Sequence, residues 1–183
     1  LKIALGLFES PYVDPELEDQ VILRQPYRDL ALVAAERSMV LLKNKGNLLP
    51  LTENKVALIG PLADDAESLL GCWHCEGQAS DVETVLDGFQ SVRPECELTY
   101  VQGCSITGEE VDEFDAAIEA AKAADVAVLV LGESGGMSGE ARCRAHLGLP
   151  GRQQELLEAI HATGTPVVCV LMSGRPLVIP WLQ

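Results

Sequence analysis

Short apolar runs alternate along the chain with segments that mix apolar and polar positions. The runs at residues 55–60 and 166–172 and the most apolar one at 126–131 carry almost no polar side chains. Continuous apolar runs of this length are typical of strands that are buried on both faces. Residues 97–101 form a fourth predicted strand. Another apolar run follows at residues 177–181.

The segments between these runs predict helices, because their apolar residues recur on one helical face. We expect helices over residues 28–42, from residue 81 onward, over 107–124 and over 150–163. Asp81 and Thr107 are the expected N-caps of the second and third helices, since both residue types accept backbone hydrogen bonds there. Residues 66–73 are ambiguous. Residues 1–26 contain Gly6 and three prolines and predict a connector that is extended rather than helical.

Alternating strands and helices predict a three-layer α/β/α sandwich with a mostly parallel sheet. We therefore divide the chain into an interdomain connector, residues 1–26, and a sandwich domain, residues 27–183. Ligands of such sheets bind beyond the carboxyl ends of the strands. The Gly-rich loop at residues 134–149 follows one of these ends, and a loop this long in a compact domain is usually functional or disordered.

The net charge and the lengths of the apolar runs limit the classes of partner that this chain can bind. The 183 residues carry 28 acidic against 13 basic side chains, a net charge of −15, which argues against nucleic acid or an anionic membrane surface as partner. No apolar run approaches the ~20 residues of a membrane span. The first residues resemble neither a signal peptide nor a chain start, and the last stop on apolar side chains. We expect an internal piece of a longer chain.

Two acidic residues near the predicted strand end are candidates for chemistry. Glu140 lies in mid-loop beside Gly139, Arg142 and Arg144, where a carboxyl can be carried into a cleft and act as acid or base. An exposed loop Glu without a role is the simpler alternative. Glu133 directly follows the strand, and for it we favour an orienting role, in which it accepts hydrogen bonds from the loop backbone or an Arg.

The six cysteines, at positions 72, 75, 96, 104, 143 and 169, do not fix the cellular compartment. Cys72 and Cys75 have the spacing of a thioredoxin-like redox pair or half of a zinc site. No helix is predicted to begin there, so a loop with two incidental thiols is favoured. His74, His146 and His161 are scattered. We expect no metal and no cofactor. Pro61 also argues against a phosphate-binding loop after the first strand.

Several motifs, in order, resemble the C-terminal α/β sandwich domain of family 3 glycoside hydrolases, the β-glucosidase and β-xylosidase family. They are LGLFESPYVD at residues 5–14, AERSMVLLKN at 35–44, LLPL at 48–51, VALIGP at 56–61, GCW at 71–73, VLDG at 85–88, SGEARCR at 138–144, LPGRQ at 149–153 and LMSGRPL at 171–177. The resemblance spans nearly the whole chain. His74 and Cys75 depart from it, because small polar residues are expected there.

The resemblance implies retaining hydrolysis of β-glycosides by two carboxyl groups. An Asp nucleophile on an N-terminal TIM barrel, absent from this chain, forms a glycosyl-enzyme. Glu140 matches the Glu that protonates the leaving oxygen and then activates water. The chain's partners would be its own TIM barrel and a β-glycoside substrate, and the family's domain continues past residue 183. We therefore predict that this chain alone is inactive.

Two other classes of function stay open. The chain could be a non-catalytic carbohydrate-binding or interaction domain whose loop carries no proton. It could also be a redox module built on Cys72 and Cys75. Sugar and linkage specificity, oligomeric state and compartment (periplasmic, extracellular or cytoplasmic) depend on sequence outside these residues.

Overall fold

The computed structural model describes residues 1–182, except for the side chain of Asp19. The chain forms two compact units, Leu1–Lys45 and Gly46–Gln183. The predicted boundary between residues 26 and 27 falls inside the first unit and stays a prediction. Within the described residues, no helix is long and apolar enough to cross a membrane.

The first unit contains more helix than the sequence predicted. A 3-10 helix at Pro15–Leu17 leads into α1, Glu18–Val21, so the prediction of a connector without helix is wrong there. The cause is local. Asp14 accepts a hydrogen bond from the Glu16 amide at 3.0 Å, and Pro15 suits a first helical turn because that turn leaves its amides unpaired.

Helix α2 spans Gln25–Ser38, against the predicted residues 28–42. It begins earlier because Pro26 occupies its first turn, where no backbone donor is needed. It ends earlier because Met39 is extended, while the Ser38 hydroxyl donates to the Ala35 carbonyl at 2.8 Å. No described residue of this unit is buried, so the described part of the unit has no core of its own.

The second unit is built on four parallel strands: β1 Lys55–Ile59, β2 Glu97–Val101, β3 Val126–Gly132 and β4 Val167–Met172. Their order in the sheet is β2-β1-β3-β4. All four predicted strands are confirmed. Strand β3 is central and wholly buried, as expected for the most apolar run.

Helices α3 Ala66–Leu70, α4 Val85–Val92, α5 Phe114–Ala123 and α6 Gln153–His161 connect the strands. The predicted caps were wrong in two places. Helix α4 is capped by Thr84, not Asp81, because Thr84 and Asp87 form a reciprocal capping box. Helix α5 begins at Phe114, not Thr107. The run at 177–181 adds no strand, and Pro180–Leu182 form a 3-10 turn.

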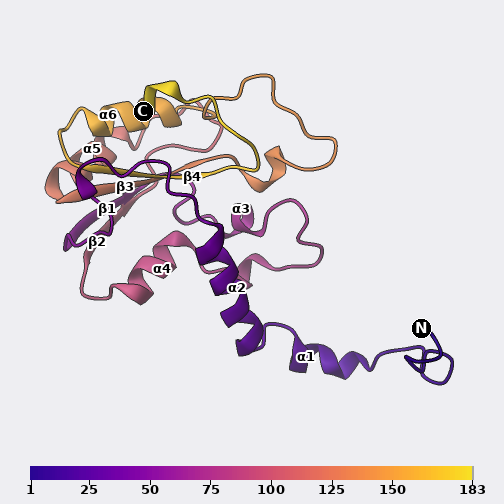
Figure 1. Cartoon of the computed structure of the whole chain (residues 1–183). Helices are drawn as coiled ribbons and strands as arrows, with labels where there is room; N and C mark the ends of the chain where they lie inside the picture. Colours follow the sequence, from indigo (N-terminus) through magenta and orange to yellow (C-terminus); the bar gives the residue numbers. More distant parts are fainter. Residues whose placement is uncertain (183) are drawn as a thin grey trace. The chain divides into compact units, whose positions relative to one another are not determined.

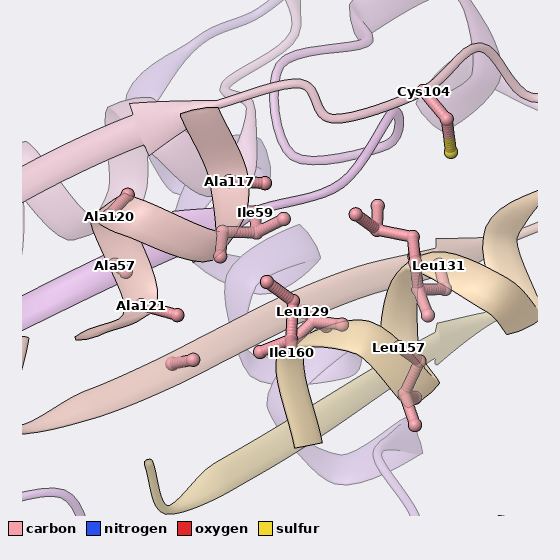
Figure 2. Close-up of a cluster of buried hydrophobic side chains, with 12 residues drawn as sticks. Ala57, Ile59, Cys104, Ala117, Ala120, Ala121, Leu129, Leu131, Leu157 and Ile160 are labelled. Atoms are coloured by element: carbon pink, nitrogen blue, oxygen red, sulfur yellow. The ribbon is translucent and has the colours of Figure 1, made fainter. Parts of the chain in front are cut away.

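Helices cover both faces of the sheet, which confirms the three-layer sandwich. Figure 1 shows α5 and α6 on one side and α3 and α4 on the other. Side chains of β1 alternate between the faces: Ile59 packs with α5 and α6, and Leu58 packs towards α4. Figure 2 shows the first cluster, in which Leu129 and Ile160 meet between β3 and α6. Because β1 and β3 pair in parallel, their carboxyl ends lie at the same edge of the sheet.

Candidate functional site

An open cleft of about 550 Å³ lies beyond the carboxyl ends of β1 and β3. One wall comes from α3 and the turn after it, including Glu67, Cys72, Trp73 and His74. The other wall comes from the loop after β3, including Ser134, Ser138, Glu140 and Arg142. The cleft is thus at the position that the parallel topology predicted for a ligand site.

Glycine at the end of β3 allows the chain to turn into this cleft. Gly132 has φ of +145°, and a Cβ added there would lie 1.8 Å from the carbonyl oxygen of Met172 on β4. No other residue fits that approach. The neighbouring strands can therefore stay paired to their ends while the loop leaves the sheet sharply.

Glu140 is exposed on the loop and lines the cleft. Positive φ values flank it, +108° at Gly139 and +58° at Ala141. A positive φ at a residue with a side chain is uncommon and costs on the order of 1–3 kcal/mol. The backbone around Glu140 is thus bent tightly, and its carboxyl is presented at the cleft surface.

The two walls touch beside Glu140. A Cβ added at Gly139 would lie 2.7 Å from the Cys72 Sγ and 3.7 Å from the Trp73 Nε1. The backbone of the Glu140 loop therefore rests directly on the turn that carries Cys72 and Trp73. Trp73 is 71% exposed, so its indole remains largely free at the cleft wall.

Glu133 lies behind the cleft, with its side chain only 1% exposed. One carboxylate oxygen accepts a short hydrogen bond from Arg144. The other accepts from Arg175 Nε at 3.1 Å and from the Ser173 hydroxyl at 3.0 Å. The predicted role as acceptor for an Arg is confirmed. Arg144 is thus bound to Glu133 and not to Glu140.

Electrostatics keep Glu133 ionised. Burial raises the pKa of the Glu133 carboxyl, but the hydrogen bonds from Arg144 and Ser173 and the charge of Arg175 outweigh that cost. The net pKa lies below its ordinary value. Glu133 is consequently an anchoring carboxylate and not a proton donor.

Residues 39–183 match the sequence model of the Glycosyl hydrolase family 3 C-terminal domain. The chain belongs to this family. The resemblance seen in the sequence motifs is thereby confirmed, and the site above is a feature of a family 3 C-terminal domain. The match includes every residue of the cleft named here.

Similarity to individual family 3 proteins extends over nearly the whole of this chain. A periplasmic β-glucosidase of Salmonella typhimurium is 37% identical, covering 98% of this chain and 27% of that protein. A β-xylosidase of Formosa agariphila is 40% identical, covering 99% and 26%. The crystal structure of a Listeria innocua β-glucosidase with isofagomine has a TM-score of 0.88 at 38% identity, covering 99% and 25%. The chain thus spans about a quarter of the length of these relatives.

The Cys72–Cys75 pair of this chain lacks the context of a redox pair. Both thiols are free and exposed. Helix α3 ends at Leu70, before the motif, so Cys72 does not occupy a helix N-terminus of the kind that acidifies such thiols. Among the described residues, no group of three or more His, Cys, Asp and Glu side chains is placed to hold a metal ion.

Gln153 is a supporting residue whose role the sequence did not reveal. It is fully buried at the first position of α6. Its Oε1 accepts from the Gly132 amide at 2.8 Å, and its Nε2 donates to the carbonyls of Gly132 at 2.9 Å and Ile106 at 3.0 Å. The side chain of Gln153 thus pairs with the Gly132 amide and carbonyl where no strand does, and it joins the end of β3 to α6. A Gln after a Pro-Gly turn gives no signal of such a contact.

Proposed function

We propose that this chain is the C-terminal domain of a retaining β-glycosidase and that Glu140 is its general acid/base. The observation that carries the proposal is the position of Glu140, exposed in a cleft at the carboxyl ends of β1 and β3 of a family 3 domain. The names of the relatives suggest the substrate class, a terminal β-linked glucoside or xyloside. The alternative is a purely sugar-binding domain in which the Glu140 carboxylate only accepts hydrogen bonds from sugar hydroxyl groups.

The other acidic residues near the cleft suit the role less well. Glu133 is buried and bound by two guanidinium groups, so it can neither reach a ligand nor release its charge easily. Glu67 also lines the cleft, but it lies in the first turn of the short helix α3, on the opposite wall from the long loop. Of the two carboxyl groups that line the cleft, Glu67 and Glu140, the one on a bent loop segment is Glu140.

In the proposed reaction, an Asp on a TIM barrel outside this chain attacks the anomeric carbon and forms the glycosyl-enzyme. The Glu140 carboxyl transfers its proton to the glycosidic oxygen as the bond to the leaving group breaks. In the second step the Glu140 carboxylate takes a proton from water, that water attacks the anomeric carbon, and the bond to the Asp breaks to release its carboxylate. The sugar leaves with its original β-configuration.

Leaving-group kinetics of the full-length enzyme test this role. Replacing Glu140 by Ala removes the proton donor, so substrates whose leaving group needs protonation should lose the most activity. We expect kcat/KM to fall about 100-fold or more for an alkyl β-glycoside and much less for dinitrophenyl β-glycoside, since general acid catalysis contributes roughly 10²–10⁴-fold.

Glu67→Ala is the matched control, because it removes a carboxyl from the opposite wall of the same cleft. It should change kcat/KM for both substrates by the same factor. Equal losses for both leaving groups in the Glu140→Ala variant would assign the acid elsewhere and favour a binding role for this loop.

A further inference from the structure

The Glu140 loop is held on both sides of Glu140 by one ionic cluster, in which a buried carboxylate binds two partly buried arginines. Arg175, which follows β4, donates through Nη2 to the carbonyl of Met137 and to the Ser138 hydroxyl at 3.3 Å. Ser138 is two residues before Glu140. Arg144 is four residues after it and donates to the Gly148 carbonyl at 3.1 Å as well as to Glu133.

Glu133 is the common partner of both arginines. It belongs to the sheet end rather than to the loop, because its amide donates to the Met172 carbonyl at 2.8 Å. The loop is therefore connected to the sheet by two guanidinium groups that share one carboxylate. Their side chains are 17% and 19% exposed, for Arg144 and Arg175 respectively.

Such a cluster is a poor way to gain stability. Removing two guanidinium groups and a carboxylate from water costs several kcal/mol per ion, and apolar side chains of similar volume often serve stability as well. The cluster instead fixes the position of the loop backbone, since planar guanidinium groups set both the distance and the angle of the hydrogen bonds to their acceptors. A loop with four glycines has few other constraints on its path.

We infer that Glu133, Arg144 and Arg175 are positioning residues that set the place of the Glu140 carboxyl in the cleft. The inference rests on the proposed acid/base role of Glu140. A general acid must lie within hydrogen-bond reach of the leaving oxygen, and a displacement of about 1 Å can cost 10²-fold in rate. The cluster acts through the loop backbone and touches no substrate.

The first test is the leaving-group dependence of Glu133→Gln in the full-length enzyme. The substitution keeps the shape of the side chain and removes the shared charge. We expect kcat for an alkyl β-glycoside to fall about 10- to 100-fold, with KM and the rate for dinitrophenyl β-glycoside changed less than about threefold. Arg175→Lys keeps the positive charge but loses the planar guanidinium group. It should lower kcat for the alkyl β-glycoside selectively as well, but by a smaller factor.

Glu97→Gln is the matched control. It makes the same substitution at an exposed carboxylate that pairs with Lys55 at 3.3 Å on the far edge of the sheet. Glu97→Gln should leave kcat and KM unchanged for both substrates. A purely structural role of Glu133 would instead lower the rates for both leaving groups equally, by reducing the amount of folded enzyme, and that result would overturn the inference.

The second test needs no activity. Amide hydrogen exchange of residues 134–149 in this chain should accelerate in Glu133→Gln and Arg175→Lys, while exchange in β3 stays slow. Unchanged loop exchange would overturn the inference whatever the kinetics show. Failure of the proposed function would give a different result. Glu140→Ala would then lower the rates for both leaving groups equally, although amide exchange of the loop would still accelerate in Glu133→Gln. If Glu133→Gln does not fold, Arg175→Lys decides both tests.

Discussion

Replacing Gln153 by Ala should weaken the whole second unit, because this side chain joins the end of β3 to α6. The change removes three hydrogen bonds, of 2.8, 2.9 and 3.0 Å, in a site that is closed to water. At about 1 kcal/mol net for each bond, the free energy of unfolding should fall by about 3 kcal/mol. The stranded amide and carbonyl of Gly132 make a smaller loss unexpected.

Guanidinium unfolding of the 183-residue chain, followed by far-ultraviolet circular dichroism, measures this effect. With a denaturant slope of about 4 kcal/mol per M, the midpoint should drop by roughly 0.7 M. Gln154→Ala is the matched control one residue along α6, since the side-chain amide of Gln154 donates to Glu158 at 2.8 Å on the exposed face. A midpoint for Gln153→Ala within 0.1 M of the control would refute the assignment of Gln153 as a structural link.

Three other results are expected. The stability advantage of the wild type over Glu133→Gln should be full above pH 4.5 and should shrink as the pH falls further, because the folded pKa of Glu133 lies below its ordinary value of 4.5; a gap of equal size in denaturant curves at pH 7 and pH 3 would contradict this. At pH 8 a maleimide should label the exposed thiols of Cys72, Cys75 and Cys143 before those of Cys104 and Cys169. Burial and the charge of Glu113 raise the pKa of Cys104 to about 11, and burial raises the pKa of Cys169 to about 12. Peptide mass mapping that finds Cys169 labelled first would be inconsistent with this packing. The purified chain alone should hydrolyse no aryl β-glucoside, and robust turnover would show that it needs no second carboxyl from outside.

The sheet could be predicted because buried parallel strands leave a strong local pattern. Runs such as residues 126–131 have no polar side chain to place, and the only environment that suits them is the interior. Helix starts were harder, since several residues compete for one cap. Asp81 and Thr84 both fit as N-caps, and the outcome depended on Asp87, whose carboxylate accepts from the Thr84 amide at 2.9 Å.

The start of α5 shows the same competition from a distance. Thr107 does not cap a helix, because residues around it form hydrogen bonds of a turn. The Ser105 hydroxyl accepts from the Gly108 amide at 2.8 Å, and Glu113 accepts from the Gly103 amide at 3.1 Å. These bonds favour a turn over a helix. Such contacts cannot be deduced from helix propensity.

The candidate site was predictable in location but not in geometry. Topology alone placed the loop after β3 at a ligand-binding edge, and the motif around Glu140 suggested the chemistry. The partners of Glu133 lie 11 and 42 residues away, at Arg144 and Arg175. Contacts at those separations are decided by the packing of the strands and loops in three dimensions, so no local pattern announces them.

Azide rescue of the full-length Glu140→Ala variant tests the central claim most directly. Once the acid/base carboxylate is removed, a small anion can enter its place and attack the glycosyl-enzyme without needing a general base. With dinitrophenyl β-glucoside, added azide should raise the turnover of Glu140→Ala and yield a β-glucosyl azide, while Glu67→Ala should form none. Glu140→Ala that is insensitive to azide and releases only glucose would contradict the assignment of Glu140 as the acid/base.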